Sequence, residues 1–298
     1  MPIQYPIDER NKFASELLSQ DEINKTIKGI NPSVPHSLSH VRASTDAASL
    51  RSSIISAISE YGEINNIHEM WMEPIIEIIS ADNEKIKDLK QVVSSEHSMP
   101  HDILQDAKSI ICFFIPFHEN VVKSNINGTM ASKKWVEAYI KTNDLIKVIN
   151  NKIEELMQRN GYKTGKIPAT HNFNEKTLIS NWSHRHIAFI AGIGTFGINN
   201  MLITKKGCCG RFGSIIINYE LDNYKQTGEI KEKCLYKLNG DCGICLKRCV
   251  VNAYDNNNFN RDICYKQCLE NAEYHKETGY ADVCGKCLVG LPCSLKEP

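Results

Sequence analysis

Apolar residues recur at helical spacing in two parts of the chain. The first part is residues 49–61, and its apolar positions are Leu50, Ile54, Ile55 and Ile58. The second part is residues 135–157, and its apolar face consists of Trp135, Tyr139, Ile146, Ile149, Ile153 and Leu156. Asn160-Gly161 follows this second part and provides a C-terminal stop. The spacing therefore predicts one short helix and one long amphipathic helix.

Continuous apolar runs predict buried strands. Residues 109–117 read SIICFFIPF, a run of strand-forming residues that ends near Pro116. Residues 201–204 and 214–219 are two further runs, and they bracket a glycine-rich turn with the sequence GCCGRFG. Because helices and strands are mixed along the chain, the sequence predicts a fold of the α/β or α+β class.

Changes in composition divide the chain into three segments. Residues 1–48 are polar, contain Pro32 and Pro35, and are expected to form a short helix followed by an extended arm. Residues 49–223 contain the predicted helices and strands and are expected to form the main folded domain. Residues 224–298 begin in a polar stretch without apolar periodicity and are predicted to form a separate C-terminal domain.

Charge and hydropathy indicate whether the protein is expected to bind nucleic acid or a membrane. The chain has 298 residues, with 35 Lys and Arg against 35 Asp and Glu, so no overall basic excess points to nucleic acid. A local basic patch could still serve a tRNA substrate. No apolar run approaches the roughly 18 residues of a membrane span. Residues 1–12 are polar and lack the apolar region of a signal peptide, so a cytoplasmic protein without membrane contact is expected.

The C-terminal segment is rich in cysteine. Of twelve cysteines in the chain, eight follow the spacing of a protein that binds two iron–sulfur clusters: Cys234, Cys242, Cys245, Cys249, Cys264, Cys284, Cys287 and Cys293. Thiolates at such spacing have few structural uses besides metal binding. In the reducing compartment expected for this chain, metal binding is also more common than disulfide formation.

The ferredoxin rule predicts how these cysteines divide between two clusters. In two-cluster ferredoxins the fourth cysteine of each run binds the other cluster. The rule assigns one cluster to Cys234, Cys242, Cys245 and Cys293. It assigns the other cluster to Cys249, Cys264, Cys284 and Cys287. Two structural zinc sites are the alternative for the same CxxC pairs, and Cys268 is a ninth thiol that could replace Cys264.

A glycine-rich loop precedes the cysteine segment. Gly192, Gly194 and Gly197 spell G-x-G-x-x-G in AGIGTFGINN. A dinucleotide site would need a strand before this loop and a helix at its third glycine, whereas a β-like segment follows here. The expected role is a close backbone approach to some flat cofactor, and the alternative is a tight turn between packed elements. For Cys208 and Cys209 we expect a tight packed turn, and for Cys112 a buried position in a strand.

The order of these features resembles that of the cobalamin-dependent epoxyqueuosine reductases and, more distantly, of the reductive dehalogenases. The resemblance is carried by AGIGTFGINNMLI at residues 191–203, by SIIIN at residues 214–218 and by the cysteine set. It covers roughly residues 100–298, and its specific part is the loop followed by the cysteine-rich tail.

The resemblance implies a nitroreductase-like cofactor-binding core followed by a ferredoxin-like domain with two [4Fe–4S] clusters. It further implies an oxidoreductase in which the clusters pass electrons to a bound corrinoid (cobalamin), which reduces a substrate. In the family that substrate is an epoxide-containing nucleoside of tRNA. An external electron donor of the ferredoxin or flavodoxin type, and a tRNA or small-molecule substrate, are the implied partners. Gly192, Gly194, Gly197 and Asn199 are then expected to contact the cofactor.

Two features differ from the family pattern. Members carry a general-acid Asp upstream of the glycine loop, whereas the corresponding stretch here, PATHNFNEKTLISNWSHRH, contains none. Asn199 stands where a lysine is common. His184 and His186 are the candidate catalytic residues, with His171 and Arg185 as polar neighbours, because a histidine can donate a proton or bind cobalt near neutral pH. The alternative for WSHRH is a helix cap.

Three functions are therefore open at this point. The first is a corrinoid-dependent iron–sulfur reductase similar to epoxyqueuosine reductase. The second is an electron-transfer or corrinoid-handling protein without that activity, and the missing Asp favours it. The third is a flavin-dependent reductase built on the same core.

Overall fold

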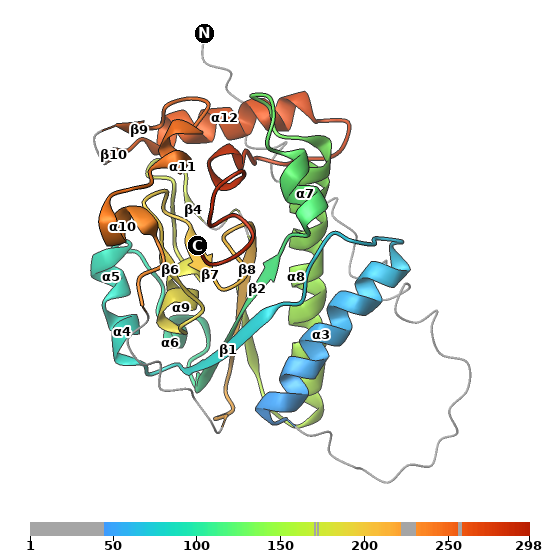
Figure 1. Cartoon of the computed structure of the whole chain (residues 1–298). Helices are drawn as coiled ribbons and strands as arrows, with labels where there is room; N and C mark the ends of the chain where they lie inside the picture. Colours follow the sequence, from blue (N-terminus) through green and yellow to red (C-terminus); the bar gives the residue numbers. More distant parts are fainter. Residues whose placement is uncertain (1–44, 170, 172, 222–230, 256–257) are drawn as a thin grey trace. The chain divides into compact units, whose positions relative to one another are not determined.

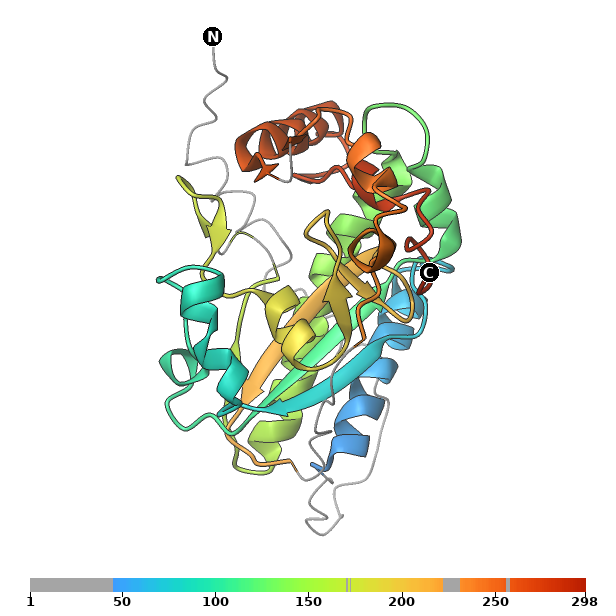
Figure 2. The same ribbon diagram turned by 60° about the vertical axis from the view of Figure 1, so that its left-hand side comes forward.

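The structure is a computed structural model that describes residues 45–169, 171, 173–221, 231–255 and 258–298 (Figures 1 and 2). Within the chain, residues 43–298 form one compact unit. Nearly all of the predicted arm over residues 1–48, and the predicted boundary near residue 223, lie outside the described residues. The described unit mixes helices and strands, so the predicted α+β class is confirmed.

A four-stranded antiparallel sheet forms the centre of the unit. Its strand order is β1 (Ile75–Ser80), β2 (Ser109–Pro116), β8 (Gly210–Ile217) and β3 (Thr164–Lys166). All eight residues of β2 are buried, as a run of strand formers covered on both faces requires. The predicted strand over residues 109–117 is therefore confirmed.

The glycine-rich stretch before residue 214 differs from the prediction of a turn. Strand β8 already begins at Gly210, so half of GCCGRFG belongs to the sheet. Gly213 lies opposite Phe113, and a Cβ on this glycine would lie 2.4 Å from the Cζ atom of the Phe113 ring. Glycine is therefore needed here for packing inside a strand, a use that local composition does not distinguish from a turn.

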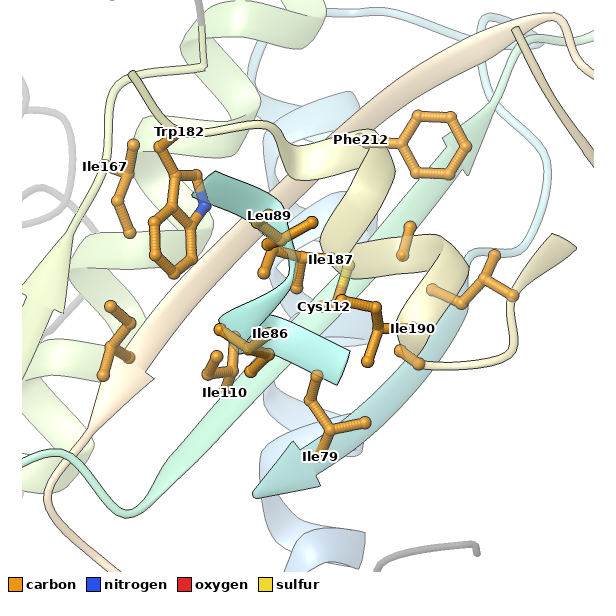
Figure 3. Close-up of a cluster of buried hydrophobic side chains, with 14 of the residues drawn as sticks. Ile79, Ile86, Leu89, Ile110, Cys112, Ile167, Trp182, Ile187, Ile190 and Phe212 are labelled. Atoms are coloured by element: carbon orange, nitrogen blue, oxygen red, sulfur yellow. The ribbon is translucent and has the colours of Figure 1, made fainter. Parts of the chain in front are cut away.

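Helices cover both faces of the sheet. Helices α3 (Ala47–Ile64) and α8 (Lys133–Arg159) cover one face (Figure 1), and their buried side chains include Leu50, Ile54, Leu145, Ile146, Ile149 and Ile153. On the other face lie α4 (Glu84–Lys87), α5 (Leu89–Val92) and α9 (His184–Ile190), together with Trp182 and Phe212 (Figure 3). Both helices predicted from apolar spacing are thus confirmed, with α8 slightly longer than expected.

The cysteine-rich tail packs on the end of the sheet where β2 ends and β8 begins. The backbone N–H of Cys208, just before β8, donates to the carbonyl of Cys293 over 2.9 Å. A third apolar cluster joins Trp135, Val136 and Tyr139 of α8 to Leu288 and Val289 of the tail. The tail elements are α10 (Leu235–Asn239), α11 (Ile244–Lys247), β9 (Tyr254–Asp255), β10 (Asn258–Phe259), α12 (Arg261–Tyr274) and the 3₁₀ turn η1 (Lys286–Leu288).

Short elements complete the described unit, and helix α8 is its longest. The remaining elements are α6 (Pro100–Ile103), α7 (Glu119–Ser124), β4 (Phe173–Asn174), β5 (Ile179–Ser180), β6 (Gly194–Phe196) and β7 (Leu202–Thr204). In the described part of the chain, no helix combines the length and the apolar character that crossing a membrane requires.

Two adjacent isoleucines of α3 test this packing. Ile54 is fully buried against the sheet, whereas Ile55 is 45% exposed. We expect Ile54→Ala to lower the free energy of unfolding by about 2–5 kcal/mol, because it removes buried methyl groups and leaves a cavity. The matched change Ile55→Ala should cost less than about 1 kcal/mol. Urea unfolding followed by circular dichroism measures both, and equal losses would contradict this placement of α3.

Candidate metal centre

The eight cysteines gather into two quartets around two neighbouring cavities. Cys234, Cys242, Cys245 and Cys293 line the smaller cavity. Cys249, Cys264, Cys284 and Cys287 line the larger one, which measures about 370 Å³, and Cys268 lines it as well. The structure thus brings together both sets that the ferredoxin rule predicts, with Cys268 as a fifth thiol beside the second set. Metal binding by these residues stays a prediction.

Burial raises the pKa values of several thiols in the two quartets. Burial, with a smaller contribution from the neighbouring thiols of Cys293 and Cys234, raises the pKa of the Cys245 thiol to about 12. In the larger cavity, burial raises the pKa of Cys287 to about 12 and that of Cys284 to about 11. A bound metal would displace these protons, because the thiolate is the metal ligand. Metal affinity is therefore expected to increase with pH.

The two quartets line cavities of very different size, about 20 Å³ for the first and about 370 Å³ for the second. A single zinc ion would need its sulfur ligands about 2.3 Å from one position. Among the described residues, no three His, Cys, Asp or Glu side chains converge to hold one metal ion. The twelve cysteines and the lining of both cavities are compatible with iron–sulfur binding.

The turn from Cys284 to Cys287 is held by asparagines of the core. The Asn125 side-chain Nδ2 donates to the carbonyl of Cys284 over 2.9 Å. The Asn199 side-chain Nδ2 donates to the carbonyl of Cys287 over 3.0 Å. Both asparagines are buried, with exposures of 0% and 5%. The carbonyls at both ends of this CxxC turn are therefore bonded to the core, which holds the backbone of the turn in place.

Two residues between these cysteines complete the attachment. Lys286 is 1% exposed, and its Nζ donates to the carbonyls of Asn125 and Asn127 over 2.9 and 2.7 Å. Gly285 has φ +73°, and a Cβ on it would lie 2.3 Å from the Cζ2 atom of Trp135 on α8. Only glycine permits this backbone to lie against the indole ring.

Hydrogen bonds reach the sulfur atoms of the second quartet. The backbone N–H of Ala253 donates to Cys249 Sγ over 3.2 Å, and the Tyr254 hydroxyl lies 4.0 Å from Cys287 Sγ. A hydrogen bond with Cys268 lowers the pKa of Cys264, and the same bond, with burial, raises the pKa of Cys268. The two thiols are therefore a hydrogen-bonded pair, and both remain candidates for the same ligand position.

The remaining cysteines lie behind the ligand sets or in the sheet. Cys208 and Cys209 are fully buried, and the Cys209 thiol donates to the carbonyl of Leu288 over 3.2 Å. A hydrogen bond with Cys208 raises the pKa of the Cys293 thiol. Cys112 is fully buried in β2, where burial raises its pKa. The expected packed positions of these thiols are confirmed.

The glycine loop is a β-hairpin that lies beside the first quartet. Gly192 follows α9 with φ +79°, and strands β6 and β7 pair antiparallel around the loop. A Cβ on Gly194 would lie 2.2 Å from the carbonyl oxygen of Ile203, so glycine is required by the hairpin itself. Gly197 and Asn199 line the first cavity, and Asn199 also lines the second. Contact of this loop with a cofactor remains a prediction.

His184 belongs to a buried hydrogen-bond chain under the sheet. Its Nδ1 pairs with Ser214 Oγ at 2.8 Å, and its Nε2 with the carbonyl of Pro168 at 3.1 Å. Ser214 Oγ also accepts from the Trp182 indole N–H over 3.0 Å. Burial lowers the pKa of His184 to about 4, so the ring is neutral near pH 7. The pairing fits a proton on Nε2 and an acceptor at Nδ1.

His186 and Arg185 are held at the start of α9. The His186 Nδ1 pairs with Ser183 Oγ, the N-cap of α9, at 2.7 Å, and burial lowers the His186 pKa to about 4. The Arg185 Nη1 donates to the carbonyl of Asn200 over 2.5 Å. Neither His184 nor His186 lines either cavity. The helix-cap alternative for WSHRH thus describes the local structure, and a catalytic role for either histidine stays untested.

A polar wall faces the second cavity, and the sequence reasoning missed it. Tyr139 donates from its hydroxyl to Asp282 Oδ1 over 2.6 Å, and the Arg211 guanidinium lies 4.5 Å from the centre of the Tyr139 ring. All three residues line the cavity. His171, with φ +60°, places Nε2 at 3.4 Å from Asp282 Oδ2. The sequence contained one indication of this polar wall, which is the position of Asp282 two residues before Cys284.

Comparisons with known proteins identify structures of one kind. A scan against protein-family models gave no match, and no curated protein matched the chain. The structural neighbours are epoxyqueuosine reductases. The structure from Streptococcus thermophilus is 16% identical with a TM-score of 0.44, aligned over 81% of this chain and 67% of that one. The structure from Bacillus subtilis is 18% identical with a TM-score of 0.48, aligned over 81% and 66%.

A third neighbour is an epoxyqueuosine reductase with a tRNA-Tyr epoxyqueuosine-modified stem loop. It is 17% identical with a TM-score of 0.47, aligned over 81% of this chain and 66% of its own. This chain therefore spans about two thirds of the length of these structures.

The neutral state of His184 predicts a loss of stability in acid. The unfolded chain takes up a proton as the pH falls below about 6.5, whereas the folded chain does so only near pH 4. Stability is therefore lost between these values, by about 2 kcal/mol from pH 7 to pH 5. Urea unfolding of the wild type and of His184→Gln at both pH values measures this. Between pH 7 and pH 5, His184→Gln should lose about 2 kcal/mol less stability than the wild type. The exposed control His68→Gln should lose as much stability as the wild type. An equal loss of stability in all three proteins would contradict a neutral His184.

Proposed function

We propose that this protein is an iron–sulfur reductase similar to epoxyqueuosine reductase, in which two [4Fe–4S] clusters pass electrons to a bound corrinoid. The observation that carries the proposal is the pair of cysteine quartets around adjoining cavities, of which the second opens onto a polar wall. A single structural metal site would explain only one quartet. It would not explain the second quartet or a cavity that can hold another molecule. The nitroreductase-like nature of the core and the ferredoxin-like nature of the tail belong to the same proposal.

The residues present fit two clusters. Each quartet supplies four thiols, the number that a [4Fe–4S] cluster takes. The glycines at positions 243 and 285 have positive φ, which lets backbone N–H groups lie close to sulfur. Asn199 lines both cavities, so the two clusters would lie on either side of one side chain. Such clusters accept and donate single electrons, the step a reductase needs between a carrier and its substrate.

The second cavity fits a substrate-sized molecule or one face of a larger cofactor. Its volume of about 370 Å³ is in the range of sites for drug-sized ligands, and the second quartet occupies part of its wall. A corrinoid exceeds that size, so the described residues could contact only part of it. Arg211 and Asn199 are two of the donors on this wall that could bind its amide groups. When bound, a corrinoid would supply a strongly reducing cobalt centre.

The substrate is proposed at the level of class. A modified nucleoside of tRNA is the first compound to test, because the sequence resemblance points to it. The stretch from Pro168 to His186 contains no Asp, and the carboxylate that faces the cavity is Asp282 from the tail. Asp282 and Tyr139 can hydrogen-bond a substrate hydroxyl there, and Arg211 can bind a phosphate. A substrate other than epoxyqueuosine is compatible with this different wall.

Two alternatives remain tied to specific observations. An electron-transfer or corrinoid-handling protein without substrate chemistry is favoured by the missing Asp of the glycine-loop region. A flavin-dependent reductase is favoured by the flat aromatic residues of the second cavity, which include Phe173, Tyr254, Phe259 and Tyr265. A yellow chromophore that co-purifies with the protein would support the flavin alternative.

Iron analysis tests the two-cluster proposal. Protein purified without oxygen should hold about eight irons and eight sulfides per chain. Cys249→Ala should lower iron to about four per chain, because it removes one ligand of the second quartet. The control Cys268→Ala should keep about eight irons, since this thiol is assigned as a neighbour of the quartet. Zinc in place of iron, or equal iron loss in both variants, would contradict the assignment.

A titration with cobalamin tests the second cofactor. The iron-loaded protein should shift the visible spectrum of cobalamin as it binds. Arg211→Gln should weaken binding about tenfold, because it removes a charged donor from the cavity wall. Arg51→Gln changes an arginine of α3 that pairs with Glu77 and should bind as the wild type does. Full iron content with no cobalamin response would rule out the corrinoid and leave the alternatives above.

A further inference from the structure

Apolar side chains are exposed beside the first quartet. Tyr236 and Leu238 of α10 are 37% and 58% exposed, and Ile244 of α11 is 39% exposed. These three residues define the α10–α11 patch. A Cβ on Gly243 would lie 3.6 Å from the Tyr236 ring, so the two short helices are in contact there. Clustered exposed apolar side chains of this kind commonly mark an interaction surface.

The patch lies on the two short helices that carry cysteines of the first quartet, α10 and α11 (Figure 1). Cys234 is the N-cap of α10, Cys242 precedes α11, and Cys245 lies within α11. Tyr236 itself lines the cavity of this quartet. The second quartet faces the core through Tyr139, Arg211 and Asn199. A partner bound to the patch would therefore lie close to the first quartet, whereas the second quartet faces the cavity assigned to cofactor or substrate.

Charges around the patch are mainly positive. The segment of residues 231–247 carries four lysines and two acidic residues, although the whole chain is neutral. Two of these lysines are paired: Lys237 lies 3.7 Å from Glu232, and Lys233 lies 2.5 Å from Glu297. Lys231 and Lys247 are exposed, and Asp241 is the exposed acidic residue. An apolar centre with a charged rim is the usual composition of a protein interface, and the sign of the rim selects the partner.

We propose that the α10–α11 patch is the docking surface for an acidic one-electron carrier protein, which reduces the cluster of the first quartet. The proposal rests on the iron–sulfur function proposed above. In each encounter the carrier loses one electron and the oxidised cluster gains it, and no bond is made or broken. Complexes of this kind are small and short-lived, with buried areas below about 1,200 Å². Three apolar residues with a lysine rim suit such an interface, and lysines accelerate its formation with a negatively charged partner.

Stopped-flow reduction by a carrier tests the surface. The probe is an acidic ferredoxin, reduced beforehand and mixed without oxygen with the oxidised, iron-loaded protein. The second-order rate constant of cluster bleaching should fall about tenfold in Lys247→Glu at low salt, and the difference should shrink at high salt. Leu238→Ser should lower the rate at both salt concentrations, because it removes apolar contact. Neither residue is assigned as a ligand or as part of the second cavity.

Matched controls on α5 separate docking from general effects. Lys90→Glu makes the same charge change at an exposed site, and Val92→Ser removes an apolar side chain that is 64% exposed. Both should keep the wild-type rate with the carrier. The absorbance that excess dithionite bleaches per chain should be the same in all five proteins, because dithionite needs no docking surface.

The outcomes distinguish this surface from the proposed function. Equal carrier rates in the wild type and in both patch variants, with normal dithionite bleaching, would overturn the docking surface alone. Slower rates in the α5 controls as well would also overturn it. Protein without any dithionite-reducible iron would overturn the proposed function and the docking surface together.

Discussion

The turn between Cys284 and Cys287 is the contact on which the arrangement of the site depends. Buried polar groups need partners, and an unsatisfied one costs about 1–3 kcal/mol. Asn125, Asn199 and Lys286 are buried, and each has a hydrogen-bond partner across the boundary between core and tail. Separation of the turn from the core would leave several buried donors and acceptors without partners. The core therefore holds this cysteine pair in position, and the second quartet is formed by core and tail together.

Helix α8 connects this attachment to the rest of the fold. Its later turns carry Ile146 and Ile149 against the sheet, and its first turns carry Trp135 against Gly285. Tyr139 lies between these regions and turns its hydroxyl to Asp282 of the tail. One rigid helix thus positions the sheet, the cysteine turn and the polar wall of the second cavity. Such a wall loses little order when a ligand binds, because packing has already fixed its side chains.

The sequence predicts a structural feature well when the residues that determine this feature lie close together in the chain. The period of α8, the apolar run of β2 and the grouping of the cysteines each arise from residues close together in the chain. The partners of the cysteine turn do not: Asn125 and Asn199 lie 159 and 88 residues from the carbonyls that they bond. An isolated asparagine has no pattern that reveals such a partner. The glycine loop matched a cofactor motif, yet Gly194 is required by its own hairpin, where the Ile203 backbone leaves no room for a Cβ. His184 was a candidate catalytic residue because a histidine side chain can titrate near neutral pH. In the structure, burial beside Ser214 keeps the ring neutral. The sequence does not reveal this burial, because the tertiary fold determines it.

The two quartets differ in what surrounds them, and this difference gives the site a direction. Around the second quartet, Ala253 N–H donates to Cys249 sulfur and the buried Lys286 interacts with Cys284. Donors and a cation stabilise added negative charge, which is what reduction of a cluster creates. Around the first quartet, Cys293 has a neutral thiol, that of Cys208, as its neighbour. The hydrogen bond between Cys208 and Cys293 gives the first quartet a sulfur partner too, so the direction comes from position. If both quartets hold clusters, the second lies beside the cavity and its polar wall, and the first lies beside α10 and α11. This arrangement favours an order in which an electron passes from the first quartet to the second.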